Sequence, residues 1–557
     1  MTRHRNRTVG MRLVPLLLVL LLGSSLVAAP AGADPPSQID GSGSSWAENA
    51  VNQWVSDVHS QGVEVVYSPD GDSQGRQDFA NKVSDFSVTS DGYQGLDPVT
   101  GVSDTSGGRP YAYLPIAAGG TSFPYQIRFD GQQVENLRLS GQTLVKIFTN
   151  VITNWDDPEI TQDNNGHALP SLPITPVVQS EGSGATEQLT NFFATDFPNQ
   201  WKAFAGQSGA TEYFPRQGDQ IAQNGSNGAM NYVASSQANG SISYVEYSFA
   251  LSVNYPVAKV LNAAGYYTLP TQYNVAVSLE AAQINMDPNS PDYLLQNLTN
   301  VYVDPDPRTY PLSSYVYMIE PTGSAPAESS ITTGKRQALA DFGYYSICQG
   351  QKEIGPIGYS PLPVNLVEAG FGQLQKLQTV DPAVDLTNLN ILTCNNPTFV
   401  LGQPNTNYLA TIAPLPPPCD QVGTGPCAAG VTPNGIGATP TSSGVVAGAG
   451  GTSGGSGSAA QGGASGSGPG SAAATAAAAA ASAGTGGAAP SGAGSAGGGA
   501  SSDSASAAIV NATLPGTETS TLFRDWGLLA VVLLLLAFCV PAFIGVRRIR
   551  RQREEAS

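Results

Sequence analysis

The chain has 557 residues, of which 24 are basic and 42 acidic, and its formal net charge is −18 at pH 7. This acidity excludes a broad basic surface, so we expect no nucleic-acid partner. A chain of this length exceeds one compact domain, so we expect several parts with different roles.

The first 33 residues have the pattern of a secretory signal peptide. Four arginines precede an apolar run, Leu13–Ala29, and residues 31–33 supply the small side chains of a cleavage site. We therefore expect residues 1–33 to be removed and the next domain to be extracytoplasmic.

Predicted helices and strands alternate after the signal. A helix is expected to begin at Trp46, because apolar side chains recur after it at helical spacing. A strand is expected at Val63–Tyr67, followed by a helix at Gln77–Val83 in which Phe79 and Val83 share one face.

A second strand–helix pair is expected further along the chain. The strand is Ile174–Val178, and the helix after it carries Leu189, Phe192 and Phe193 on its inward face. Strand–turn–helix units predict an α/β fold with parallel strands, and ligands bind beyond the carboxyl ends of such strands.

Three glycine- and serine-rich turns, each just ahead of a predicted helix, form the candidate site. They are residues 41–45, 70–75 and 181–186, which read GSGSS, DGDSQG and EGSGAT. The start of a helix presents unpaired N–H groups and partial positive charge, glycine lets a ligand approach the backbone, and serine adds a hydroxyl donor. If the three turns converge, they predict an anion receptor that needs few cationic side chains.

Four cysteines lie in the expected extracytoplasmic part, where disulfides persist. They allow three pairings, and proximity in sequence favours Cys348–Cys394 and Cys419–Cys427, each worth roughly 2–4 kcal/mol. A fifth, Cys539, lies in an apolar segment and is expected to be a free thiol. No clustered Cys/His pattern predicts a metal site, and we expect no cofactor.

The last part of the chain has the composition of a spacer followed by a membrane anchor. Residues 421–502 contain no charged residue and are mostly Gly, Ser, Ala, Thr and Pro, which predicts a disordered stalk; a partner-recruiting role is the alternative. The uncharged run Trp526–Val546 is long enough for one transmembrane helix. Five arginines follow it, so we expect a single-pass cell-membrane protein with a cytoplasmic C-terminus.

Without the signal and the tail, 15 basic and 40 acidic residues remain, a formal charge of −25. Such a domain would be repelled by an anionic membrane surface and would not steer an anionic ligand from a distance. It can still bind an anion, because a buried site responds to local dipoles.

Several further segments stand in order along residues 38–375: 137–140 (LRLS), 147–148 (IF), 152–160 (ITNWDDPEI), 182–184 (GSG), 243–247 (SYVEY), 310–312 (YPL) and 358–363 (GYSPLP). Together they resemble the PstS family of phosphate-binding receptors of phosphate ABC transporters. The resemblance implies a two-lobed periplasmic-binding-protein fold of type II. It also implies a monomer that holds phosphate or a similar small oxyanion between its lobes and delivers it to an ABC-transporter permease.

The resemblance also implies a division of the chain. The expected parts are a signal peptide (1–33), a substrate-binding domain (34–428), a low-complexity linker (429–525), a transmembrane helix (526–546) and a basic tail (547–557). Within the domain we expect lobe I at about 38–118 and 309–385, lobe II at about 119–308, and a cysteine-containing extension at 386–428.

The family's ligand contacts fall on the three turns and on a position after the helix that follows the second turn. The matching positions and their neighbours are Ser44, Ser45, Asp72, Ser73, Ser90, Asp91, Gln179, Ser183, Gly184, Ala185 and Thr186. The family's aspartate corresponds to Ser90 without a gap, or to Asp91 if one residue is inserted.

Three positions depart from the family pattern. Ala185 stands where the family's Ser-Gly-Thr has its threonine, with Thr186 one step later, and a small shift would match the family's serine to Ser73 and leave Asp72 outside the cleft. Gln179 stands where the family has an arginine, which removes a charge-assisted donor, and Asp72 places a carboxylate where the family has a serine. We therefore expect a phosphate or oxyanion receptor of weakened affinity. The alternatives are a receptor retuned to a different polar ligand and a surface scaffold that has lost its ligand.

Other segments have both a structural and a functional interpretation. Trp155 is expected to anchor a turn, the 243–247 segment to pack as strand and hinge, and the 224–228 loop to be an ordinary turn, although it could reach the cleft. Residues 71–75 also match the Gly-x-Ser-x-Gly pattern of a serine hydrolase with Ser73 as nucleophile. Because the mature chain has only His59 and His167 to act as the base, we expect no enzyme.

Overall fold

The computed structural model describes residues 37–427, apart from residues 97–100, 102, 401 and 404–405. The expected signal peptide, low-complexity linker, transmembrane helix and basic tail lie outside these described residues. Among the helices that are described, none has the length and apolarity needed to cross a bilayer.

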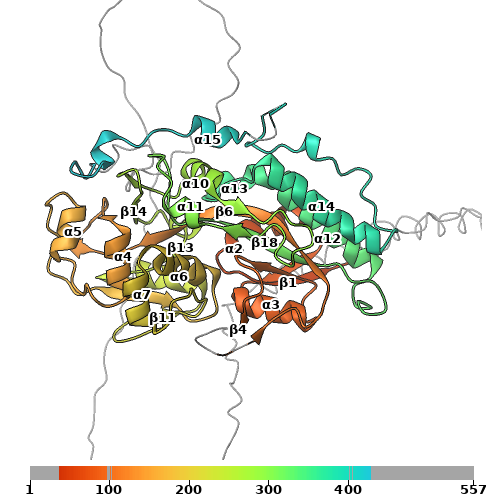
Figure 1. The fold of residues 1–557 in the computed structure, drawn as a ribbon, viewed down its shortest axis with the longest axis horizontal. Helices are drawn as coiled ribbons and strands as arrows, with labels where there is room; N and C mark the ends of the chain where they lie inside the picture. Colours follow the sequence, from red (N-terminus) through yellow and green to blue (C-terminus); the bar gives the residue numbers. More distant parts are fainter. Residues whose placement is uncertain (1–36, 97–100, 102, 401, 404–405, 428–557) are drawn as a thin grey trace, which may run out of the picture. The chain divides into compact units, whose positions relative to one another are not determined.

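A nine-stranded sheet is the main element of the described chain (Figure 1). Seven strands follow the order β15-β14-β6-β18-β3-β1-β2, while β13 pairs with β6 and β9 pairs with β14. The strands β1, β2 and β3 are parallel, and β18 is antiparallel to both β3 and β6. The bounds are β1 (Ile39–Gly43), β2 (Val65–Ser68), β3 (Phe86–Thr89), β6 (Tyr111–Pro124), β9 (Arg138–Leu139), β13 (Val245–Glu246), β14 (Val257–Leu261), β15 (Tyr267–Thr268) and β18 (Ser313–Pro321).

The first lobe, which we call lobe I, contains β1–β3, β18 and the helices packed on them. Helix α2 buries the apolar stripe expected from its spacing, although Val55 is only half-buried. The indole of Trp54 in α2 donates to the Gly350 carbonyl at 3.0 Å, which ties α2 to the start of α13. The helices are α2 (Glu48–His59), α3 (Asp72–Ala80), α12 (Thr333–Ile347), α13 (Gln351–Ile357) and α14 (Val364–Val380), and a small hairpin is formed by β4 (Gly95–Leu96) and β5 (Ser103–Asp104).

The second lobe, lobe II, contains a three-stranded parallel sheet in the order β11-β10-β12. The inward face of α6 buries Leu189, Phe192 and Phe193, as expected. Trp155 is fully buried and donates to the Gly240 carbonyl at 3.0 Å, consistent with a structural anchor. The bounds are β10 (Thr175–Gln179), β11 (Ile221–Gln223), β12 (Ser241–Ile242), α4 (Gly141–Phe148), α5 (Pro158–Asp163), α6 (Gly184–Asp196), α7 (Pro198–Ala205), α8 (Gly225–Ala234), α9 (Tyr247–Ser252), α10 (Gln272–Ser278) and α11 (Thr299–Tyr302).

Strand β6 connects the two lobes. Its first part pairs with β18 of lobe I, and its last part pairs with β13 and β14, which continue into lobe II. Short elements complete the described chain: the hairpins β7 (Arg128–Phe129) with β8 (Gln132–Gln133) and β16 (Gln283–Ile284) with β17 (Gln296–Asn297), the 3-10 helices η1 (Leu279–Ala281), η2 (Ile391–Thr393) and η3 (Pro418–Asp420), and helix α15 (Tyr408–Ile412).

The helix expected at Gln77–Val83 lies earlier in the chain than predicted. It begins at Asp72, directly on the second turn, and ends at Ala80, after which Lys82 adopts a left-handed φ of 60°. Phe79 is buried, but Val83 lies beyond the helix and is 72% exposed, so the prediction that both share a buried face was wrong for Val83. The reversal at Lys82 turns the chain away before another helical turn can form.

Residues 386–427, which we call the C-terminal strap, run from lobe I to lobe II. The phenol of Tyr344 donates to the Asn390 carbonyl at 3.0 Å, so the strap begins against α12 of lobe I. It then passes α10, against which α15 packs, and reaches β9 and β14 of lobe II. In Figure 1 this segment is coloured blue.

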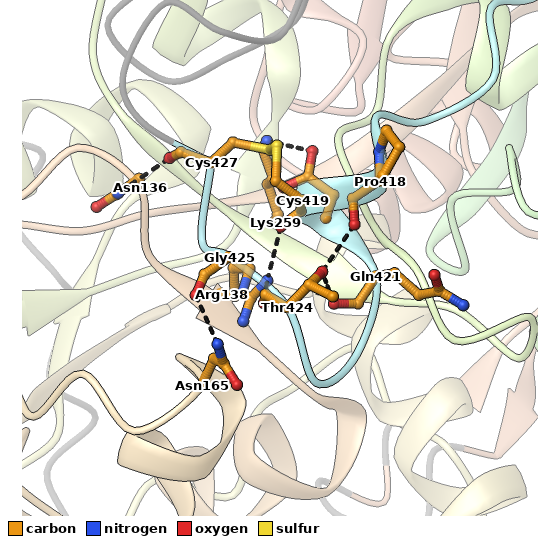
Figure 2. The surroundings of a disulfide bond; sticks show 11 residues. Asn136, Arg138, Asn165, Lys259, Pro418, Cys419, Gln421, Thr424, Gly425 and Cys427 are labelled. Carbon is orange, nitrogen blue, oxygen red and sulfur yellow. Dashed lines mark hydrogen bonds and ion pairs between the residues drawn. A yellow bond between two sulfur atoms is a disulfide. The ribbon is translucent and has the colours of Figure 1, made fainter.

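Both disulfides expected from sequence proximity are present, and both hold the strap. Cys348–Cys394 joins it to the end of α12, with Cα atoms 4.8 Å apart, and Cys419–Cys427 closes its last loop, with Cα atoms 5.0 Å apart. Figure 2 shows this last loop beside Arg138, whose guanidinium donates to the Cys419 carbonyl at 3.2 Å and the Thr424 carbonyl at 2.9 Å.

Candidate functional site

The first and third turns meet between the lobes. Ser45, just after β1 in lobe I, accepts a hydrogen bond at its Oγ from the Ser226 backbone N–H in lobe II at 3.1 Å. The Gln179 amide nitrogen lies 3.4 Å from Ser226 Oγ, and Ser183 Oγ donates to Gln179 Oε1. A continuous set of polar contacts therefore links Ser45 to Ser183 across the cleft.

The second turn also reaches lobe II. The Ser73 N–H donates to the Gly182 carbonyl at 3.1 Å, and the Ser73 hydroxyl lies 2.8 Å from the Tyr213 hydroxyl. Gly71 has φ of 105°, and a side chain there would collide with Glu181. Glycine is thus required at residue 71 by both the backbone conformation and the close approach of the third turn.

The start of α6 packs directly against Asp72 and Ser90 of lobe I. A Cβ at Gly184 would overlap the Ser90 hydroxyl and Asp72 Oδ1, so only glycine permits this approach. Ser183 is the N-cap of α6, and its side chain accepts from the Thr186 N–H at 3.4 Å. The helix start is therefore aimed at the polar groups of the opposite lobe.

Several buried oxygens at this point have unused hydrogen-bonding capacity. Asp72 Oδ1 accepts from the Ser90 N–H at 2.6 Å, but Asp72 Oδ2 has no partner among the described residues. The hydroxyls of Ser44 and Ser90 also lack one there. All three residues are at most 1% exposed. Buried polar atoms are normally paired, so this cluster is chemically suited to a polar guest.

Tyr244 belongs to the same cluster, although the sequence suggested only packing for it. Its hydroxyl lies 2.8 Å from Thr186 Oγ1 and accepts from the Gln179 N–H at 3.2 Å. Burial raises the pKa of Tyr244, so the phenol stays protonated at neutral pH. The Tyr244 hydroxyl therefore holds Gln179, just before the third turn, and Thr186, at the end of that turn.

One cation, Arg76, lies next to the site on α3, but its charge is already neutralised. Its guanidinium lies 2.6 Å from Asp104 and 2.5 Å from Glu212, and it donates to Thr89 Oγ1 at 2.8 Å. Because Asp104 is in lobe I and Glu212 is in lobe II, Arg76 also joins the lobes. An anion in the cluster would therefore depend on helix starts and hydroxyls for its stabilisation.

The two candidates for the family's aspartate position have different surroundings. Ser90 faces Asp72 and Gly184, whereas the Asp91 carboxylate accepts from the Gln188 amide of α6 at 3.1 and 3.2 Å. Burial raises the pKa of Asp91 to about 8, and the charges of Glu212 and Asp72 add to the rise. The position that faces Asp72 and Gly184 is therefore occupied by the Ser90 hydroxyl, and the Asp91 carboxyl group lies beside it.

The structure brings together the residues proposed from the three turns and the β3 end. Ala185 is buried in the first turn of α6, so it offers a backbone N–H and no polar side chain. Tyr213 and Arg76 also lie here, and sequence reasoning did not propose them; Ser226 lies here too, in the 224–228 loop that was expected to be an ordinary turn although it could reach the cleft. For Ser226 a signal was available, since the 224–228 turn precedes a helix as the other three do.

Comparison with known proteins identifies the relatives of this chain. A model of the PBP superfamily domain matches residues 29–349. The chain is 30% identical over 332 residues to phosphate-binding protein PstS 2 of Mycobacterium tuberculosis, covering 58% of this chain and 83% of that protein. It is 29% identical over 350 residues to phosphate-binding protein PstS of Xylella fastidiosa, covering 62% of this chain and 87% of that protein.

Among solved structures, the chain is similar to a high-affinity periplasmic phosphate-binding protein, with a TM-score of 0.45 and 19% identity over 60% of this chain and 92% of that one. The family assignment follows from the superfamily match and the sequence relatives. The chain belongs to the PBP superfamily and, within it, to the PstS family.

Proposed function

We propose that this protein is an extracytoplasmic receptor that captures inorganic phosphate or a similar small oxyanion between its lobes. The observation that carries the proposal is the convergence of the three turns on buried oxygens that have no partner among the described residues: Ser44 Oγ, Asp72 Oδ2 and Ser90 Oγ. The relatives named phosphate-binding proteins support the choice of ligand.

Donors and acceptors divide between the two lobes. The backbone N–H groups at the start of α6, together with the hydroxyls of Ser44, Ser45 and Ser90, would donate to the oxygens of the anion. Asp72 Oδ2 can only accept, so it would bind a protonated oxygen of the ligand. With Gln179 in place of a cation, affinity should be weaker than in a site that uses arginine.

Binding requires no chemical step by the protein. The Ser73 hydroxyl is engaged by Tyr213, whereas His59 lies at the surface and pairs with Glu64 at 3.1 Å. This arrangement supports a binding role over the serine-hydrolase alternative. In this proposed role the protein would deliver its ligand to an ABC-transporter permease, and residues 526–546 would anchor it in the membrane.

Closure of the lobes would exclude water from the anion. The contacts that hold them together include Ser45 with Ser226, Ser73 with Gly182, and Arg76 with Glu212. Lower local dielectric would then strengthen each hydrogen bond to the ligand. Release would follow reopening about the β6 connection.

Isothermal titration of the full-length protein with phosphate tests the proposal. We expect saturable binding, weakened by Ser183→Ala but not by Ser252→Ala, which removes a hydroxyl at the end of α9. Absence of heat at millimolar phosphate would reject phosphate as the ligand. A thermal-shift comparison of phosphate, sulfate, phosphonates and sugars would then separate a retuned receptor from a ligand-free scaffold.

A further inference from the structure

A polar hollow of about 240 Å³ opens beside the candidate site. We call it the acidic hollow, and the residues that matter for its chemistry are Ser90, Asp91, Tyr93, Glu187, Asp292 and Tyr317. Most come from the end of β3, from β18 and from the 285–296 loop, while Glu187 comes from α6. Lobe II and lobe I thus both contribute to its wall.

The lining of the acidic hollow contains acidic side chains and no basic ones among the described residues. Among the described residues that line it, three carry carboxyl groups and none is lysine or arginine. Tyr93 and Tyr317 add aromatic rings, and carboxylates with aromatic faces are the groups that recognise an ammonium ion. These side chains would not stabilise a ligand that carries only negative charge, whereas they would stabilise a cation.

The acidic hollow and the oxyanion cluster share residues. Ser90 lines the hollow, and its backbone N–H donates to Asp72 of the cluster at 2.6 Å. Asp91 is its neighbour in sequence and is held by Gln188, one turn into α6 from Ser183. The two regions therefore adjoin at Ser90.

A second observation, independent of the carboxylates, indicates a ligand here. The Ser90 hydroxyl is 1% exposed and finds no partner in the part of the chain that the structure describes. Ser90 belongs to the cluster, where its hydroxyl faces Asp72 and Gly184, and also to the lining of the hollow, so a ligand that spans the two regions would pass beside this hydroxyl. Such a buried group is rarely left unpaired without a guest.

We propose that the ligand of this receptor is a small zwitterion, an oxyanion joined by a short linker to an ammonium group. The oxyanion would occupy the cluster between Ser45, Asp72 and Ser183, and the ammonium would lie in the acidic hollow near Asp91 and Asp292. Aminoalkyl phosphonates and phosphate esters of amino alcohols have this chemistry. This inference rests on the proposed oxyanion-binding function and names its ligand class.

The zwitterion accounts for two departures of the site from a simple anion receptor. Gln179 removes positive charge from the site, and Asp72 adds a carboxyl group to it. Both changes disfavour an isolated dianion. They disfavour a zwitterion less, because its ammonium group compensates for the nearby carboxylates.

The test compares two ligands of nearly equal shape on the full-length protein. By calorimetry, 2-aminoethylphosphonate should bind at least ten-fold more tightly than propylphosphonate, which has a methyl group in place of the ammonium. Asp292→Asn should reduce this ratio several-fold. Asp130→Asn is the matched control, since Asp130 lies in the exposed β7–β8 turn with φ of 48°, a conformation that asparagine also adopts.

Equal affinity of the two phosphonates for the wild-type protein would overturn the zwitterion inference. Inorganic phosphate is titrated in parallel to separate the two proposals. Binding of phosphate with a phosphonate ratio near one would reject only the zwitterion, whereas no binding of any of the three would reject the oxyanion function as well. An unchanged ratio in Asp292→Asn would also count against the hollow as the ammonium site.

Discussion

The cleft between the lobes and the C-terminal strap both join lobe I to lobe II, but they do so with different chemistry. The cleft uses close glycine approaches, hydroxyls and Arg76, and within the described part of the chain it leaves oxygens of Ser44, Asp72 and Ser90 without a partner. The strap uses two disulfides, backbone carbonyls around Arg138, and the Lys259–Asp420 pair.

This difference suggests that the cleft and the strap have different roles. Contacts with spare hydrogen-bonding capacity can exchange protein partners for a ligand, whereas covalent links cannot. We therefore expect substitutions at the cleft to change ligand affinity as well as stability. Substitutions in the strap should change stability alone.

The largest effect is expected for Arg76→Gln. Arg76 is fully buried between Asp104 and Glu212, so its loss leaves two buried carboxylates without their cation. The free energy of unfolding should fall by about 3–5 kcal/mol, measured by urea denaturation. Lys82→Gln, at a half-exposed lysine 3.7 Å from Glu328, should cost less than about 1 kcal/mol. Similar losses of stability in the two variants would show that Arg76 contributes no more than an exposed ion pair does.

Breaking the strap should have a comparable but smaller effect. Lys259 lies 2.6 Å from Asp420, and burial lowers the pKa of the lysine and raises that of the aspartate. Lys259→Met leaves the aspartate buried alone and should cost about 3 kcal/mol, whereas Lys259→Met with Asp420→Leu should recover most of the loss. A change in phosphate affinity for either variant would contradict the separation of strap and cleft.

Ionisation of Asp91 should make the cleft sensitive to pH. Its pKa is raised to about 8 by burial and by the charges of Glu212 and Asp72, while Arg76 and Gln188 act in the opposite direction. A raised pKa means that the folded state holds its proton more tightly, so this stability is complete below about pH 4 and is lost as the pH rises through 8.

Asp91→Asn should therefore flatten the fall in stability between about pH 4 and 8 when melting is followed across that range. Ser252→Ala provides the comparison, because it removes no titratable group and leaves Asp91 unchanged, so it should retain the wild-type slope there. Parallel pH profiles for wild type and Asp91→Asn would show that Asp91 does not carry the effect.

The parts of this molecule that depend on local sequence could be predicted, and those that depend on distant contacts could not. The helix starts at Ser183 and near Ser45 follow from glycine, serine and apolar spacing within a few residues. The disulfide pairings follow from proximity. The ion pair between Arg76 and Glu212 could not be predicted, because it depends on how two residues 136 positions apart in the sequence come together in the fold.

The end of α3 shows the same limit at short range. Val83 fits the helical spacing after Phe79, yet Lys82 takes a left-handed conformation that ends the helix, and no glycine or proline there predicts this end. Tyr244 was similarly ambiguous, since a buried tyrosine on a strand usually packs. Its role at the third turn depends on Thr186 and Gln179, which approach it only in the folded lobe.

The smallest effect expected in the cleft is that of Ser183→Ala. Ser183 is the N-cap of α6, and its hydroxyl also bonds Gln179, so its removal should cost about 1 kcal/mol of stability. If the α6 start also holds the oxyanion, phosphate affinity should fall about five-fold or more in calorimetry. Ser140→Ala removes the corresponding N-cap of α4, which caps Thr143, and it should lower stability by a similar amount without changing affinity. Equal affinity for the two variants would show that the cap at Ser183 supports only the fold, and the distinction between cleft and strap would then have to rest on Asp72 and Ser90.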